Sequence, residues 1–150
     1  MKVQKRIGLV AHDNRKEALI EWVDHNRDEL LKHELICTGT TGKLVEECLC
    51  QNGAPAPLIT KLKSGPLGGD QQLGGMIAEG KVDMLIFLWD PMQPHPHDVD
   101  VKALLRITVL YNLPTANNRS SADFLISSPL MRQEYHPQLQ DYSSYIQRKL

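Results

Sequence analysis

The five consecutive apolar residues Met84-Leu85-Ile86-Phe87-Leu88 give the clearest strand signal in the chain. A short apolar run without alternating polar residues is typical of a strand that is covered on both faces, as in a parallel sheet. A similar run at residues 7–11, Ile-Gly-Leu-Val-Ala, predicts a second buried strand. Weaker strands are predicted at residues 35–37, 57–62 and 114–116.

Segments with helical spacing separate these strands. Residues 16–23 place Ala18, Leu19, Trp22 and Val23 on one face of a helix. Further helices are predicted at residues 42–50, around 76–78, at 101–111, at 122–126 and at the terminus, 142–150. The alternation predicts an α/β fold: a single three-layer, doubly wound domain over residues 1–150, built on a five-stranded parallel sheet.

The 150 residues include 17 Lys and Arg and 18 Asp and Glu, which gives a net charge of -1. This balance argues against nucleic acid or a membrane surface as a partner, since both attract an excess of basic residues. No segment approaches the roughly 20 apolar residues of a membrane span, and the first apolar run is too short for a signal peptide. We therefore expect a cytoplasmic protein, in which Cys37, Cys48 and Cys50 are reduced thiols.

Polar residues follow each predicted strand. In open α/β sheets, ligands bind outside the carboxyl ends of the strands, so these segments share one edge. They combine hydroxyls, glycines, carboxylates, histidines and a lysine in the segments His12–Lys16, Thr38–Gly42, Ser64–Gln72, Trp89–Asp100 and Asn117–Ser121. The sequence therefore predicts the functional site at this edge.

The segment Thr38-Gly39-Thr40-Thr41-Gly42 lies where a strand turns into a helix. Glycines let the backbone approach an anion, and the N–H groups at a helix start bind phosphate. The segment is not a Walker A loop, because Cys37 replaces the first glycine and Leu44 replaces the Ser or Thr that follows the lysine. The segment is compatible with an ordinary capped turn or with a phosphate site. Lys16 is compatible with an exposed surface residue or with a phosphate ligand.

The segment Ser64–Gln72 is rich in glycine and carries Asp70 just before a predicted helix. Two interpretations of Asp70 are compatible: an N-cap, which aspartate fills well, or an ionised base that removes a proton from carbon. His95 and His97 resemble metal ligands, but no known metal motif surrounds them, and solvated histidines in a rigid, Pro-rich loop are the favoured interpretation. His97 is also a candidate neutral imidazole that polarises a carbonyl group.

Together these segments resemble the methylglyoxal synthase family. The matching stretches occur in the family's order and at its separations, within residues 6–127: Leu9–Asp13, Thr38–Gly42, Ser64–Gln72, Leu88–Pro91 and His97–Arg106. The resemblance implies a carbon–oxygen lyase that converts dihydroxyacetone phosphate to methylglyoxal and inorganic phosphate through an enediolate. It also implies that no cofactor and no metal are required.

The resemblance further implies roles for individual residues. Asp70 is expected to be the catalytic base and His97 a catalytic and substrate-binding residue. The other expected substrate and phosphate contacts are His12, Lys16, Thr38, Gly39, Thr40, Thr41, Ser64 and Gly65, and the expected supporting carboxylates are Asp13, Asp90 and Asp100. The resemblance also implies a homohexamer that inorganic phosphate inhibits, with Arg106 and Lys149 at a subunit boundary. Lys149 stands where the family often has arginine, and a lysine cannot make the bidentate phosphate contact of an arginine.

Two other functions stay open. A non-catalytic regulatory domain of the same fold would bind a phosphorylated or nucleotide effector and would not need the acid–base residues. A metal-dependent aldolase would use His95 and His97 as ligands and would contain a metal when purified.

Overall fold

A computed structural model describes residues 1–50 and 57–147. Its centre is a sheet of parallel strands in the order β3-β2-β1-β4-β5. The strands are β1 (Arg6–Ala11), β2 (Glu34–Thr38), β3 (Leu58–Leu62), β4 (Met84–Leu88) and β5 (Thr115–Ala116). The predicted five-stranded, doubly wound α/β architecture is confirmed.

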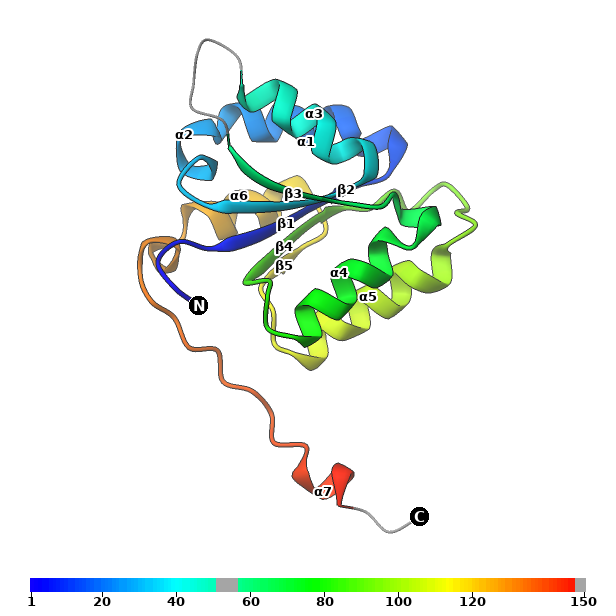
Figure 1. Ribbon diagram of the computed structural model, residues 1–150, viewed down its shortest axis with the longest axis vertical. Coiled ribbons are helices and arrows are strands. Elements are labelled where there is room, and N and C mark those ends of the chain that lie inside the picture. Colours follow the sequence, from blue (N-terminus) through cyan, green and yellow to red (C-terminus); the bar gives the residue numbers. More distant parts are fainter. Residues whose placement is uncertain (51–56, 148–150) are drawn as a thin grey trace.

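Helices cover both faces of the sheet (Figure 1). One face carries α1 (Lys16–His25), α2 (Arg27–Leu30), α3 (Gly39–Leu49) and α6 (Arg119–Ser127), and the other carries α4 (Gly69–Ala78) and α5 (Asp98–Leu110). Side chains of a strand alternate between the faces, so Leu9 and Ile86 belong to one buried core and Val10 and Phe87 to the other. Continuous apolar strands are needed because both faces are buried.

The connections and the tail contain shorter elements: the 3₁₀ helices η1 (Asp13–Arg15), η3 (Gly65–Leu67) and η4 (Pro129–Arg132), and the helix α7 (Ser143–Ile146). The buried Lys5 ammonium donates to the carbonyl oxygens of Lys2 and Gln133, which ties the start of the tail to the N-terminal segment. Beyond this point the tail extends away from the sheet, past the end of α5, to α7 (Figure 1), and its Gln138 carbonyl oxygen accepts the Asn112 side-chain amide at 3.0 Å.

Three predicted helices begin earlier than expected. The helices predicted at residues 42–50, 101–111 and 122–126 begin at Gly39, Asp98 and Arg119. Their first turns are polar and carry no apolar periodicity, so the hydrophobic pattern misses them; Asn118, for example, caps α6 by accepting the Ser121 N–H. Helix α2 was not predicted. Of the predicted terminal helix, the described part forms only Ser143–Ile146, and residues 148–150 lie outside the described residues.

Within residues 1–50 and 57–147, no helix is both long enough and apolar enough to cross a membrane. Cys37, Cys48 and Cys50 are all free thiols, as expected.

Candidate functional site

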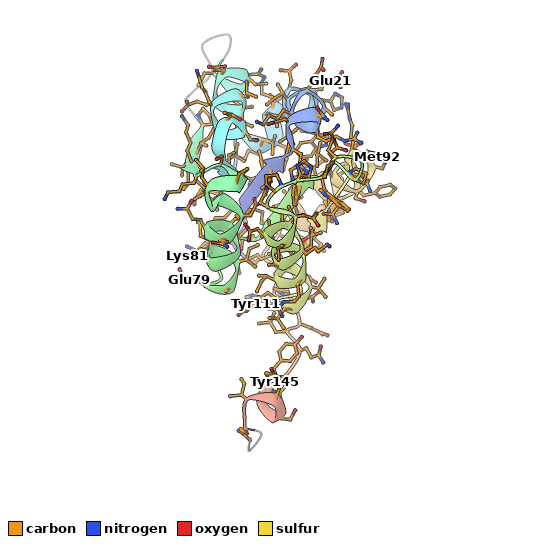
Figure 2. The ribbon with its side chains drawn as sticks, turned by 90° about the vertical axis from the view of Figure 1, so that its right-hand side faces the viewer. Glu21, Glu79, Lys81, Met92, Tyr111 and Tyr145 are labelled. Atoms are coloured by element: carbon orange, nitrogen blue, oxygen red, sulfur yellow. The ribbon has the colours of Figure 1, made fainter. Side chains whose placement is uncertain are left out.

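A cavity of about 310 Å³ opens at the carboxyl edge of the sheet. This volume is at the lower end of the range for small-molecule sites. The strand order reverses at β1, and the segments after β1, β2, β3 and β4 all contribute to the cavity. Figure 2 shows Met92, from the segment between β4 and α5, at the upper right of the body, and Tyr111 at the bottom of the body, near the tail.

Every residue predicted to act in catalysis or substrate binding lines this one cavity: His12, Lys16, Thr38, Gly39, Thr40, Thr41, Ser64, Gly65, Asp70 and His97. Of the three predicted supporting carboxylates, Asp13 alone lines it. The cavity therefore joins residues separated by up to 85 positions in the sequence, because four neighbouring parallel strands end there.

The Thr38–Gly42 segment forms the first turn of α3 rather than a loop ahead of it. Thr38 occupies the N-cap position but makes no side-chain capping bond. This helix start therefore has no side-chain cap, and phosphate binding there stays a prediction. The first N–H groups of a helix lack partners within the helix, and the helix dipole makes this end positive. A helix start of this kind, lining a cavity, can hold an anion.

Gly39 brings this turn against the segment after β3. Its backbone has a positive φ of 45°, and its N–H donates to the Lys63 carbonyl oxygen at 3.1 Å. A Cβ at this position would lie 2.8 Å from both Cα and Cβ of Ser64. Glycine is required here, because any side chain would push the two segments apart.

Lys16 connects the starts of α1 and α3. Its ammonium donates to Asp13 Oδ1 at 2.6 Å and to the Thr40 hydroxyl. The Lys16 contact holds the pKa of Asp13 below its usual value, so this carboxylate is ionised. Lys16 is thus partly exposed, with its charge at the cavity wall beside the helix start, and its role as a phosphate ligand stays a prediction.

Asp70 is the second residue of α4 and is almost completely buried, with 2 % of its surface exposed. Gly68, in the left-handed conformation, occupies the N-cap position, so the N-cap interpretation of Asp70 is wrong. Neither carboxylate oxygen has a hydrogen-bond partner among the described residues. Burial raises the pKa of Asp70; the nearby His97 opposes the rise and Asp100 adds to it. Burial therefore disfavours the ionised form of this carboxylate.

His97 lies directly beside this carboxylate, with Nε2 at 3.5 Å from Asp70 Oδ2. Gly65 fits against both side chains: a Cβ there would lie 2.8 Å from His97 Nε2 and 3.1 Å from Asp70 Oδ2. His97 Nδ1 is buried and has no hydrogen-bond partner in the described parts of the chain. The three residues form one compact group that can act on a single small ligand.

His12 is held in one neutral form. Its Nδ1 accepts the backbone N–H of Asp90 at 3.1 Å, so the proton of the neutral ring is on Nε2. Burial, with further contributions from His95 and His97, lowers the pKa of His12 to about 4. Nε2 is buried without a partner within the described ranges. His12 therefore offers an uncharged hydrogen-bond donor to a ligand.

The other two predicted supporting carboxylates lie outside the cavity. Asp90 accepts the Met92 N–H at 3.0 Å and the Asn14 amide at 3.1 Å, and these bonds lower its pKa. Asp100 accepts the Gln71 amide at 3.1 Å. Both carboxylates fix the loops and helices that carry the cavity residues.

The placement of Arg106 and Lys149 at a subunit boundary stays a prediction. Arg106 is exposed on α5 and lines a separate groove with residues of the tail. Lys149 lies outside the described residues.

His95 was interpreted from sequence as a solvated histidine of a Pro-rich loop, with a metal ligand as the alternative, yet it lines the cavity and stacks on His12 with ring centroids 3.7 Å apart. The signal available in the sequence was its position two residues before His97, in the segment that follows β4. Among the residues that the structure describes, no group of three or more His, Cys, Asp or Glu is arranged to hold a metal ion.

Comparison with known proteins places this chain among close relatives. A family model described as the MGS-like domain matches residues 18–117. The methylglyoxal synthase of Oleidesulfovibrio alaskensis is 60% identical over 148 residues, covering 99% of this chain and 97% of the relative. That of Maridesulfovibrio salexigens is 57% identical, with complete coverage of both. The crystal structure of methylglyoxal synthase from Elizabethkingia anophelis superposes with a TM-score of 0.89 at 48% identity, over 100% of this chain and 95% of the other.

Proposed function

The chain belongs to the methylglyoxal synthase family, and on this premise we propose that it converts dihydroxyacetone phosphate to methylglyoxal and inorganic phosphate. The observation that carries the mechanism is the buried pair of Asp70 and His97, 3.5 Å apart in a cavity that also contains a helix start and Lys16. A base and a polar hydrogen-bonding group thus stand beside an anion site.

The cavity has two chemically different sides, which orient the substrate. On one side the first turn of α3, the Thr40 hydroxyl and the Lys16 ammonium provide donors and positive charge for the phosphoryl group. On the other side Asp70, His97 and Gly65 lie together, where the three-carbon part of the substrate would bind. Binding the phosphoryl group thus places the carbon atoms at the base.

Asp70 removes a proton from the hydroxymethyl carbon next to the carbonyl group. Because its oxygens have no other hydrogen bonds within the described residues, they are available to the substrate. Because burial raises its pKa, the ionised carboxylate is a stronger base than an exposed aspartate. The base must be ionised to act, so activity falls as the pH decreases through this raised pKa.

The negative charge that develops on the substrate oxygens is stabilised by imidazole donors. His97 lies next to the base, and the neutral His12 presents Nε2–H to the same cavity. Fixed donors in a buried site stabilise such a charge more strongly than water does, because they need no reorganisation. A donor with a pKa far below neutrality, as in His12, stays uncharged throughout the reaction.

Elimination then depends on the orientation of the phosphoryl group. The proton of the terminal hydroxyl first passes to the other enediolate oxygen. When the C–O bond to phosphate is perpendicular to the enediolate plane, the electron pair on the terminal oxygen forms the aldehyde C=O, the C=C pair shifts to the neighbouring carbon–carbon bond, and the C–O bond breaks. Phosphate leaves with the electrons of that bond, and the remaining enol takes a proton on its terminal carbon to become methylglyoxal. The contacts of α3 and Lys16 are placed to hold this orientation, and no cofactor is needed.

Incubating the protein with dihydroxyacetone phosphate and measuring methylglyoxal and free phosphate together tests this function. Equal amounts of both products are expected. Formation of neither product would favour the regulatory domain, although the presence of Asp70, His97 and Asp13 in one cavity supports an enzyme. A metal-dependent aldolase predicts that a chelator abolishes activity and that zinc or magnesium restores it, whereas we expect activity to survive chelation.

We further propose that the chain functions as a single domain, in the cytoplasm, as a homohexamer inhibited by inorganic phosphate. The support is the extent of the family resemblance, which covers nearly the whole chain. Sedimentation at micromolar concentration should give an assembly larger than a dimer, and a monomer would contradict the proposal. Rate measurements with added phosphate would show whether inhibition is cooperative.

A further inference from the structure

His95 occupies a constrained position at the cavity wall. Prolines precede and follow it, and the ring of each proline limits the backbone conformations available to this segment. Its carbonyl oxygen accepts the Asp98 N–H at 3.1 Å, which anchors it to the start of α5. Its imidazole lies on the His12 ring with centroids 3.7 Å apart and an angle of 40° between the planes. Backbone and ring are therefore both held in place.

The polar atoms of this ring point to a ligand. His95 Nε2 is buried and has no hydrogen-bond partner among the described residues, and the same is true of His12 Nε2 and both oxygens of Asp70. Buried polar atoms in folded proteins are nearly always hydrogen bonded. Several unpartnered atoms around one cavity indicate that a bound molecule provides the missing partners.

The neighbours of His95 indicate which part of the molecule this is. His12 Nε2–H is a donor, so it cannot accept a hydrogen bond from the stacked ring. When the proton of His95 is on Nε2, both rings need an acceptor from the ligand. His12 is followed by Asp13, which binds Lys16 beside the start of α3. A phosphoryl group has three terminal oxygens, enough for Lys16 and a further donor, whereas the carbonyl oxygen has only two lone pairs, which the donors of His97 and His12 fill.

We propose that His95 is a further substrate-binding residue, which donates a hydrogen bond through Nε2 to a phosphoryl oxygen of the substrate. This inference rests on the proposed function, because it assigns a contact within the same site. Inorganic phosphate carries the same oxygens and serves as a probe that needs no turnover.

Two variants separate the donor from the shape of the ring. His95→Phe keeps a ring that stacks on His12 but has no donor, and His95→Gln places an amide N–H near the position of Nε2. Loss of one neutral hydrogen bond should raise both the KM for dihydroxyacetone phosphate and the Kd for inorganic phosphate about 5-fold in His95→Phe. His95→Gln should restore most of this loss, and kcat should change less than KM in both variants.

The proposal fails if His95→Phe binds inorganic phosphate as tightly as the unmodified protein. It also fails if KM rises without a change in the phosphate Kd, since the contact would then be to another part of the substrate. If His95→Phe retains phosphate binding and His95→Gln loses it, the His95 ring contributes through packing on His12 and not through a hydrogen bond, and the proposal fails. Thermal melting checks that each variant folds. If His95→Phe does not fold, His95→Asn takes its place, because the shorter asparagine amide cannot reach the position of Nε2. An unmodified protein that binds phosphate but forms no methylglyoxal would refute the proposed function and leave the phosphate measurement as a separate test of His95.

Discussion

Replacing Asp70 with asparagine separates the contribution of this residue to catalysis from its contribution to stability. The substitution keeps the size of the side chain but removes the base. Loss of a positioned general base lowers kcat by a factor of about 10² to 10⁴. Lys16 and the start of α3 are unchanged, so the affinity for inorganic phosphate should be retained.

The same substitution should stabilise the protein at neutral and alkaline pH. Burial raises the pKa of Asp70, which means that the ionised carboxylate is less favourable in the folded chain than in the unfolded chain. Each unit of this rise corresponds to about 1.4 kcal/mol of lost stability above the folded-state pKa. For a chain of this size, each kcal/mol changes Tm by roughly 2–4 °C. The Tm of Asp70→Asn should therefore exceed that of the unmodified protein by about 2–4 °C for each kcal/mol of folding stability that the substitution restores.

Thermal melts at several pH values provide the assay, together with steady-state kinetics. The Tm difference should decrease as the pH falls through the raised pKa, because the carboxyl group of the unmodified protein then becomes protonated and uncharged as well. Asp28→Asn is a control, since Asp28 is exposed on α2 and lies outside the cavity. Near-normal turnover by Asp70→Asn would refute its role as the base. A Tm that falls at pH 8 would refute the argument that the buried carboxylate destabilises the fold.

Gly65→Ala should lower kcat by up to about 10²-fold, because the new Cβ would displace the His97 ring. The control is Gly75→Ala, whose Cβ would have no atom within 4 Å; it should stabilise α4 by about 1 kcal/mol and leave turnover unchanged. Equal turnover rates for the two variants would contradict the close contact between Gly65 and His97. Lys16→Ala should raise the KM and the phosphate Kd about 10- to 100-fold through loss of a charge-assisted hydrogen bond, measured by kinetics and calorimetry, with little change in Tm. Asp100→Asn should lower the pKa of Asp70, so the acid limb of kcat/KM should move to lower pH; an unchanged pH profile would exclude this coupling.

The sequence by itself determined the strands and the edge at which ligands bind. Met84–Leu88 and residues 7–11 could be recognised because a parallel strand buried on both faces must be apolar throughout. The polar segments after these strands were assigned to one edge because parallel strands all end on the same side. These are local properties, and burial imposes them residue by residue.

Where polar residues replace the apolar pattern, sequence analysis was less accurate. The first turns of α3, α5 and α6 were missed because they are polar. The Asn118 side chain caps α6, and in α3 the Gly39 N–H bonds to the carbonyl oxygen of the distant Lys63. Gly39 illustrates the reason: its conformation is required only because Ser64, from another strand's connection, packs against it. Nothing in the neighbouring sequence contains that information.

The tertiary structure alone decided the state of the reactive groups. Pairing of β1 with β4 brings the Asp90 N–H to His12 Nδ1 across 78 positions, which fixes the proton of His12 on Nε2. Packing of α4 and α5 against the sheet buries Asp70 beside His97 and raises its pKa, whereas Asp90 and Asp100 are left outside the cavity. The sequence specifies which chemical groups are available. Their protonation and directions depend on desolvation and on contacts between distant segments, which exist only once the chain has folded.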